Sequence, residues 1–180
     1  DQYIENISRL INNGHKKTVP IVDNFEELDL LEERIEGKFQ IGIRIASEEE
    51  PKFEFYTSRL GIGYKNILPF YRKNIVENDN VEVKMLHFFI NTGIRDTSYY
   101  WNELSKCLKV YTSLKKECPT LDSLNIGGGF PIKNSLAFDY DYAYMIDEII
   151  NQIKIACDEA DVAVPNIFTE FGSFTVGESG

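Results

Sequence analysis

Leu124-Asn125-Ile126-Gly127-Gly128-Gly129-Phe130-Pro131 decides the fold, because a short apolar run is followed directly by three glycines. This pattern predicts a strand that ends at a glycine turn. Glycine has no Cβ, so the turn can adopt positive φ and bring several backbone N–H groups close to an anion such as phosphate. A sharp turn without a ligand is the alternative, and it is the commoner one for an isolated glycine triplet.

Asn166-Ile167-Phe168-Thr169-Glu170-Phe171-Gly172-Ser173 repeats the pattern further along the chain, now with a carboxylate at the end of the strand. In a (β/α)8 barrel, a ligand phosphate commonly lies between the loops after two late strands, and catalytic groups stand at the carboxyl ends of strands. The two motifs together therefore predict a phosphate site with an acidic side chain beside it.

Strands and helices alternate along the rest of the chain. Apolar runs predict strands over 18–23, 39–46 and 81–90 and at the two glycine motifs, and helical periodicity predicts helices near 4–14, 24–31, 66–76, 97–117 and 140–159. Asn24 and Glu27 have the spacing of a capping box. Alternating β and α units require a parallel sheet, either doubly wound or closed into a barrel, and the pattern leaves that choice open. Five such units are too few to close an eight-stranded barrel, so we expect a fragment.

Composition and charge limit the class of protein. The 180 residues are 43% hydrophobic and 13% aromatic, which indicates one folded domain or part of one. The formal net charge of −10 opposes binding to nucleic acid. No apolar run approaches the roughly 20 residues that span a bilayer, and the first residues lack the pattern of a signal peptide, so we expect a cytoplasmic protein without a membrane partner. The cysteines lack metal-site spacing and are expected to be buried free thiols, with no metal bound: Cys107, Cys118 and Cys157.

The glycine motif followed by Thr169-Glu170-Phe171-Gly172 resembles the fold type III decarboxylases of ornithine, diaminopimelate and arginine, which depend on pyridoxal 5'-phosphate (PLP). Residues 58–62, Ser-Arg-Leu-Gly-Ile, are similar to the family's Ser-Lys-Phe-Gly-Ile, and residues 85–92 lie where the family has Leu-His-x-His-Ile-Gly-Ser. Within the family, these motifs most resemble those of a bacterial arginine-decarboxylase-like branch. The resemblance implies that residues 1–180 are part of an alanine-racemase-like (β/α)8 TIM barrel that binds PLP.

The resemblance also implies roles for single residues. Glu170 would be the catalytic carboxylate that pairs with the ring nitrogen of the cofactor, and Gly172 would allow close approach. Arg44 resembles an active-site arginine, although a structural salt bridge is nearly as good an interpretation. The Thr92 hydroxyl would bind the phosphate, together with the backbone N–H groups of the glycine triplet, Gly127, Gly128 and Gly129.

Several positions depart from the family. Phe89 stands where the family places a histidine against the cofactor ring, so it can stack but cannot carry a proton. His87 is the nearest substitute on the same face, although a buried core histidine is the favoured interpretation. Ser173 replaces a family arginine near the phosphate. The Schiff-base lysine and the β-rich second domain of the family have no counterpart here, and Lys84 is no substitute, so the segment alone is expected to be inactive.

The function implied by the resemblance is PLP-dependent decarboxylation of a basic amino acid in the full-length protein. Arginine, which would give agmatine for polyamine biosynthesis, is the first candidate substrate, and ornithine and diaminopimelate are alternatives. The full-length protein would be a homodimer. A decarboxylase-like binding or regulatory protein without cofactor chemistry is the alternative from another class, and a generic phosphate-binding barrel fits the glycines but explains residues 169–172 less well.

Overall fold

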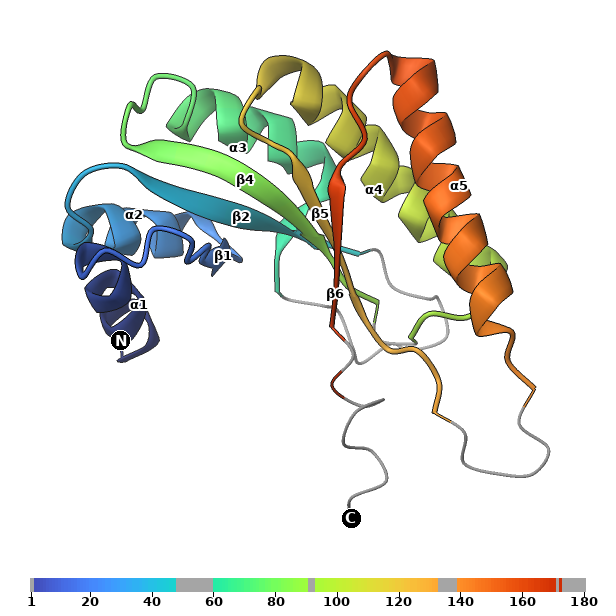
Figure 1. The fold of residues 1–180 in the computed structure, drawn as a ribbon. Helices are drawn as coiled ribbons and strands as arrows, with labels where there is room; N and C mark the ends of the chain where they lie inside the picture. The colour runs from blue at the N-terminus through green and yellow to red at the C-terminus, as the bar shows by residue number, and fades with distance from the viewer. Residues whose placement is uncertain (1, 48–59, 91–92, 133–138, 171, 173–180) are drawn as a thin grey trace.

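The computed structural model describes residues 2–47, 60–90, 93–132, 139–170 and 172 (Figure 1). Helices and strands follow one another in an alternating order. The elements are α1 (Gln2–Asn12), β1 (Ile21–Val22), α2 (Phe25–Arg34), β2 (Phe39–Ala46), β3 (Ile62–Gly63), the 3-10 turn η1 (Tyr64–Asn66), α3 (Ile67–Asn74), β4 (Val81–Phe88), α4 (Ser98–Glu117), β5 (Ser123–Gly128), α5 (Tyr142–Ala160) and β6 (Asn166–Glu170).

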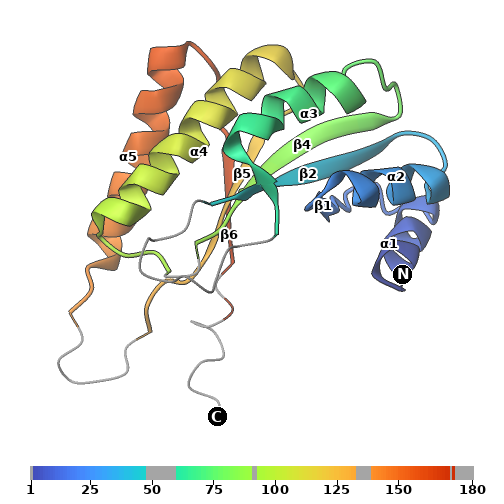
Figure 2. The same ribbon diagram turned by 180° about the vertical axis from the view of Figure 1, so that it is seen from behind.

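The strands form one parallel sheet in the order β1-β2-β4-β5-β6, and the short β3 pairs with the end of β2. A doubly wound sheet reverses its strand order at a switch point. The order here follows the sequence without a reversal within the described residues, and α3, α4 and α5 lie next to one another along one face of the sheet (Figures 1 and 2). This arrangement is that of a segment of a (β/α)8 barrel, which settles the choice that periodicity left open.

The two faces of the sheet differ in chemistry. We call the face covered by α3, α4 and α5 the outer face, and the opposite one the inner face. Outer-face side chains are aliphatic or aromatic and nearly fully buried: Ile41, Ile43, Ile45, Leu86, Phe88, Leu124 and Ile126. Because successive side chains of a strand alternate between faces, the polar residues between them point to the inner face. They include Gln40, Arg44, His87 and Asn125.

Strand β4 contains a β-bulge that changes this alternation. Its pairing with β2 runs from Ile41 opposite Val83 directly to Gly42 opposite Met85, so Lys84 is the extra residue. In a regular strand, Glu82 and His87 would lie on opposite faces because their positions differ by five, an odd number. The bulge places both of them on the inner face.

Local sequence signals explain where several elements begin. Asn24 Oδ1 accepts the Glu27 N–H at 2.9 Å, and the Glu27 carboxylate accepts the Asp23 N–H at 2.7 Å, so the predicted capping box of α2 is confirmed. Thr97 caps α4 in the same way, because its side chain accepts the Tyr100 N–H. Proline has no N–H to donate to the ladder, and β1 begins only after Pro20, which makes it shorter than the predicted strand over 18–23.

Other boundaries also differ from the sequence-based expectation. The strand β3 was not predicted, because two residues are too few to show a period. The predicted strand over 81–90 ends at Phe88, and the helix predicted from residue 66 starts as a 3-10 turn. In α5, Met145 is buried and Ile146 is 42% exposed. The three cysteines are free and buried, as predicted. No helix in the described ranges is long and apolar enough to cross a bilayer.

Candidate functional site

A row of polar side chains crosses the inner face near the carboxyl ends of the strands. Arg44 on β2 is in register with His87 on β4, which is in register with Asn125 on β5. Asn125 is in turn opposite Phe168 on β6. Glu170, the last residue of β6, lies at the same edge. Since carboxyl ends of parallel strands hold the catalytic groups in barrels of this kind, this row is the candidate active site.

The Glu170 carboxylate has described polar contacts at one of its two oxygens, Oε1. Its Oε1 atom accepts a hydrogen bond from Asn125 Nδ2 at 2.9 Å and lies 3.5 Å from His87 Nε2. The Glu170 side chain is 54% exposed. The sequence-based prediction that this carboxylate stands at a strand end, beside the glycine motif, agrees with its position in the sheet.

His87 is the most buried titratable group of the row. Its side chain is 12% exposed, and neither ring nitrogen has a hydrogen-bond partner within the part of the chain that the structure describes. Burial lowers the pKa of His87, while the nearby Glu170 charge opposes that shift and the Arg44 charge adds to it. His87 is thus largely but not fully buried, and it faces Glu170 on the inner face instead of lying in the apolar core, as we had favoured.

Arg44 forms a salt bridge, which is one of the two interpretations that the sequence left open. Its Nη1 atom lies 3.8 Å from Asp23 Oδ1, which makes an ion pair between β2 and the residue after β1. Its guanidinium carbon also lies 5.6 Å from the centre of the Phe89 ring. A cation at that distance from a ring face is attracted to it. The structure therefore places Arg44 and Phe89 together, next to His87.

The glycine triplet is packed more tightly than a free loop. Gly127 and Gly128 belong to β5, whereas we expected the strand to end before them. A Cβ at Gly128 would lie 1.9 Å from the Glu170 carbonyl oxygen, and a Cβ at Gly127, whose φ is +71°, would lie 2.8 Å from the Phe88 carbonyl oxygen. Gly129, with φ at +97°, follows β5 and is exposed. The glycines thus let β4, β5 and β6 approach one another at this edge.

One backbone donor of the triplet already has a partner. The Gly127 N–H donates to Asn125 Oδ1 at 2.8 Å. This bond corrects the expectation that all three N–H groups face a phosphate. Gly172 is exposed, and a Cβ there would meet no atom within 4 Å. The other predicted phosphate-side residues, Thr92 and Ser173, lie outside the described residues.

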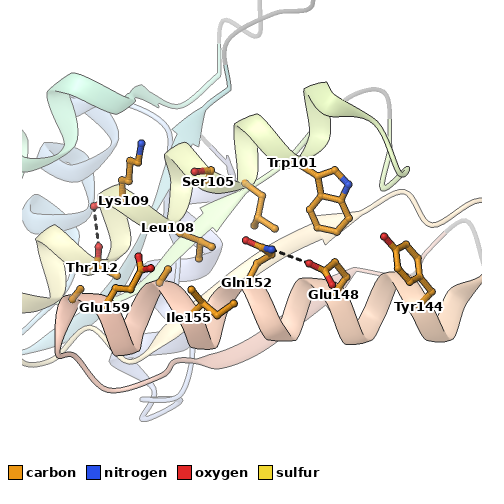
Figure 3. A pocket seen from close by; sticks show the side chains of 13 residues that line it. Trp101, Ser105, Leu108, Lys109, Thr112, Tyr144, Glu148, Gln152, Ile155 and Glu159 are labelled. Atoms are coloured by element: carbon orange, nitrogen blue, oxygen red, sulfur yellow. Dashed lines mark hydrogen bonds between the residues drawn. The ribbon is translucent and has the colours of Figure 1, made fainter.

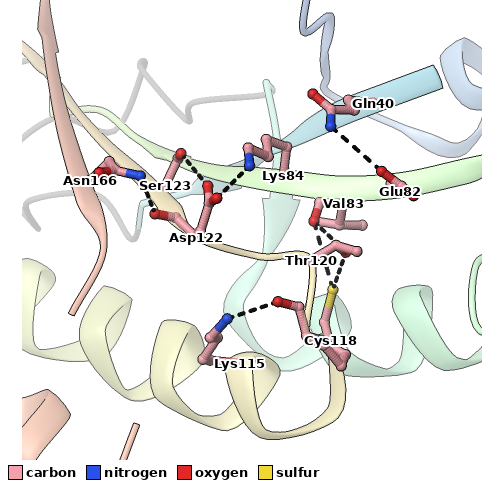
Figure 4. A network of polar contacts seen from close by, with 11 residues as sticks. Gln40, Glu82, Val83, Lys84, Lys115, Cys118, Thr120, Asp122, Ser123 and Asn166 are labelled. Atoms are coloured by element: carbon pink, nitrogen blue, oxygen red, sulfur yellow. Dashed lines mark hydrogen bonds and ion pairs between the residues drawn. The ribbon is translucent and has the colours of Figure 1, made fainter. Parts of the chain in front are cut away.

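The amino-terminal half of the inner face contains a separate polar network (Figure 4). The Lys84 ammonium donates to the Asp122 carboxylate, which also accepts the Ser123 hydroxyl at 2.7 Å. Gln40 and Glu82 form a second pair at 3.5 Å. Lys84 is therefore engaged in an ion pair with Asp122. The described residues contain no cluster of side chains that could hold a metal ion.

A cavity of about 590 Å3 lies away from this site, between α4 and α5 (Figure 3). Its lining alternates apolar and charged side chains, including Trp101, Leu108, Glu148 and Glu159. All of its lining residues belong to the two helices, so the cavity lies on the helix side of the sheet. It does not contact the polar row.

Two residues of the site were missed by sequence reasoning. Asn125 was quoted only as part of the glycine motif, although its place between Leu124 and Ile126 already puts it on the polar face of an alternating strand. Asp23 follows the short β1 and pairs with Arg44, and no pattern in the sequence marks it.

Comparison with known proteins gives a consistent result. Residues 3–177 match the family model described as "Pyridoxal-dependent decarboxylase, pyridoxal binding domain". The chain is 32% identical over 108 residues to the biosynthetic arginine decarboxylase of Citrifermentans bemidjiense, which covers 56% of this chain and 17% of that protein. It is 29% identical over 176 residues to the diaminopimelate decarboxylase of Bacillus methanolicus, which covers 89% of this chain and 40% of that protein.

Solved structures agree on the fold. The diaminopimelate decarboxylase of Helicobacter pylori, in complex with L-lysine, superposes with a TM-score of 0.77 at 20% identity and covers 98% of this chain and 44% of that chain. The biosynthetic arginine decarboxylase of Campylobacter jejuni superposes with a TM-score of 0.69 at 20% identity and covers 97% of this chain and 30% of that chain. The chain thus spans less than half the length of these relatives, and the predicted fold is confirmed.

Proposed function

Because this chain belongs to the family of pyridoxal-dependent decarboxylases, in its pyridoxal-binding domain, we propose that its full-length protein decarboxylates a basic amino acid with PLP as cofactor. Arginine is the first candidate substrate, since several similar relatives are arginine decarboxylases. Diaminopimelate and ornithine are the alternatives, and a diaminopimelate decarboxylase is among the relatives. The proposal includes a homodimer in the cytoplasm, with the lysine and the second domain supplied by other parts of the protein.

The residues at the carboxyl edge of the sheet fit this cofactor. Glu170 offers a half-exposed carboxylate whose Oε1 is anchored, which suits the protonated ring nitrogen of a pyridine. His87 has two buried ring nitrogens without hydrogen bonds in the described structure, and such atoms commonly mark a site that a bound group completes. Gly129, the first residue after β5, is exposed, so an anion can reach its backbone.

Each residue of the site has a proposed task. When bound, PLP supplies a protonated ring that takes up the electron pair left by departing carbon dioxide. Glu170 keeps the proton on the ring nitrogen. Phe89 stacks against the ring, and Arg44 adds positive charge at the same edge. Backbone N–H groups around Gly128 and Gly129, together with the Thr92 hydroxyl, would hold the phosphate, and Gly172 would allow close approach.

One observation carries the proposal: the convergence of Glu170, Asn125 and His87 at one edge of a sheet whose sequence matches the family throughout. A binding protein without chemistry is the second candidate, and it is favoured by Phe89, which cannot transfer a proton where the family has histidine.

An absorbance titration of the full-length protein with PLP, followed by carbon dioxide release from arginine, ornithine and diaminopimelate, tests the proposal. We expect a cofactor band and release from one substrate. Glu170→Gln should lower the turnover at least about 100-fold, because an amide cannot hold the ring proton. Glu82→Gln is the matched control, since this carboxylate lies on the same face but pairs only with Gln40 in the described structure. A cofactor band without release would refute the proposed reaction for these three substrates, and the absence of both would refute the proposal and favour the binding protein without cofactor chemistry.

A further inference from the structure

Asn125 makes two hydrogen bonds with one amide group. Its Nδ2 atom donates to Glu170 Oε1 at 2.9 Å, and its Oδ1 atom accepts the Gly127 N–H at 2.8 Å. The side chain therefore bridges the candidate catalytic carboxylate on β6 and the backbone of the glycine turn after β5. These are the two features of the site that would contact different ends of the same cofactor.

The orientation of this amide is fixed by its partners. A carboxylate oxygen can only accept a hydrogen bond, and a backbone N–H can only donate one. Turning the Asn125 amide over would set its oxygen against Glu170 and its NH2 group against the Gly127 N–H. Both contacts would then be repulsive, so only the observed orientation satisfies the two neighbours.

The bridge leaves one carboxylate oxygen available. Asn125 and His87 both approach Oε1 of Glu170, and no described side chain contacts Oε2. A carboxylate that is held at one oxygen cannot rotate freely, so the direction of its second oxygen is fixed as well. Since the Glu170 side chain is 54% exposed, that second oxygen can be reached from the open edge of the site.

We propose that Asn125 is a positioning residue, which holds Oε1 of Glu170 so that Oε2 faces the ring nitrogen of the cofactor and which ties that carboxylate to the glycine turn. This proposal rests on the proposed function, because it concerns the same cofactor. Asn125 does not itself contact the reacting atoms in this scheme. It acts through Glu170 and Gly127.

Two variants of the full-length protein test the proposal. Asn125→Leu has a similar shape but no polar atoms, and Asn125→Ser is too short to reach both partners, which covers the case in which one variant does not fold. Asn166→Leu is the matched control, because Asn166 is an asparagine on the same sheet whose only described side-chain contact is with the Asp122 carbonyl, at 3.3 Å.

Two measurements of bound PLP and one of the cofactor-free protein distinguish the outcomes. In both Asn125 variants we expect the PLP dissociation constant to rise about tenfold, because one charge-assisted hydrogen bond, from Asn125 to Glu170, is lost. The 15N chemical shift of the ring nitrogen should move toward its unprotonated value, which a merely structural role for Asn125 would not cause. Without cofactor, hydrogen exchange of the Gly127 amide should become faster. Asn166→Leu should change none of the three.

The results separate the two proposals. If the wild-type protein binds PLP and both Asn125 variants keep its dissociation constant and its 15N shift, the positioning role is wrong while the proposed function stands. If the wild-type protein does not bind PLP, the proposed function fails and the cofactor role of Asn125 fails with it, whereas Gly127 exchange still reports whether the bridge exists.

Discussion

Replacing Gly128 by alanine should disturb both the sheet and the site, because β5 and β6 approach each other most closely there. The new Cβ would lie 1.9 Å from the Glu170 carbonyl oxygen, and real Cβ contacts are essentially never shorter than 3.0 Å. The two strands would therefore have to separate by about 1.1 Å, and neither contact atom belongs to a flexible side chain. Overpacking of this kind costs about 1–3 kcal/mol of unfolding free energy, and we expect the upper end because backbone must move.

Thermal denaturation measures this effect directly. For a domain of this size, a loss of about 3 kcal/mol lowers the melting temperature by roughly 6–12 °C. Gly63→Ala is the control, since a Cβ there would have only Asn66 Nδ2 nearby, at 3.8 Å. The separation would also displace Glu170, so Gly128→Ala should bind PLP more weakly. If Gly128→Ala melted within about 1 °C of Gly63→Ala, the close approach of the two strands would be refuted.

Three further predictions concern single groups. The pKa of His87 is lowered by burial, so below pH 6.5, the ordinary histidine pKa, the unfolded chain binds a proton more readily than the folded chain does. The unfolding free energy should therefore be highest above pH 6.5 and fall as the pH drops below it. His87→Asn should reduce this dependence in melting curves taken between about pH 7.5 and 5.5. Tyr64→Phe should lower the unfolding free energy by about 1 kcal/mol in urea titrations, because it removes the 2.9 Å hydrogen bond to the buried Glu103 carboxylate; an unchanged midpoint would contradict that bond. The cysteines should react with a thiol reagent only after denaturation, since all three are buried and burial raises the thiol pKa of Cys107; rapid labelling of the native protein would show the packing to be wrong.

The sequence predicted those parts of the fold that depend on local periodicity. The capping box at Asn24 and the strand that ends in Glu170 follow from short-range patterns, and both have the expected local structure. The family resemblance then supplied the barrel, which alternation alone did not decide.

The bulge at Lys84 could not be predicted, because it is a feature of the register between β2 and β4, two segments that are distant in the sequence. A Cβ at Gly42 would lie 2.3 Å from Ile21 Cδ1 and 3.3 Å from Met85 Cβ. Side chains of both β1 and β4 therefore pack closely against Gly42. The Arg44–Asp23 pair was missed for the same reason: it joins two strands, and neither residue reveals its partner.

The strand order also has a consequence for how the protein is made. Each long strand of the described sheet pairs with one that precedes it in the chain, so every new strand can add to an edge that has already been synthesised. Domains fold from the amino terminus during translation, and pairings between consecutive units require only short loops to close. Both partners of Glu170, His87 and Asn125, leave the ribosome before it does. The carboxylate therefore joins side chains that are already in place, and a ribosome that stalled before β6 would hold a sheet that lacks this strand and, with it, the carboxylate.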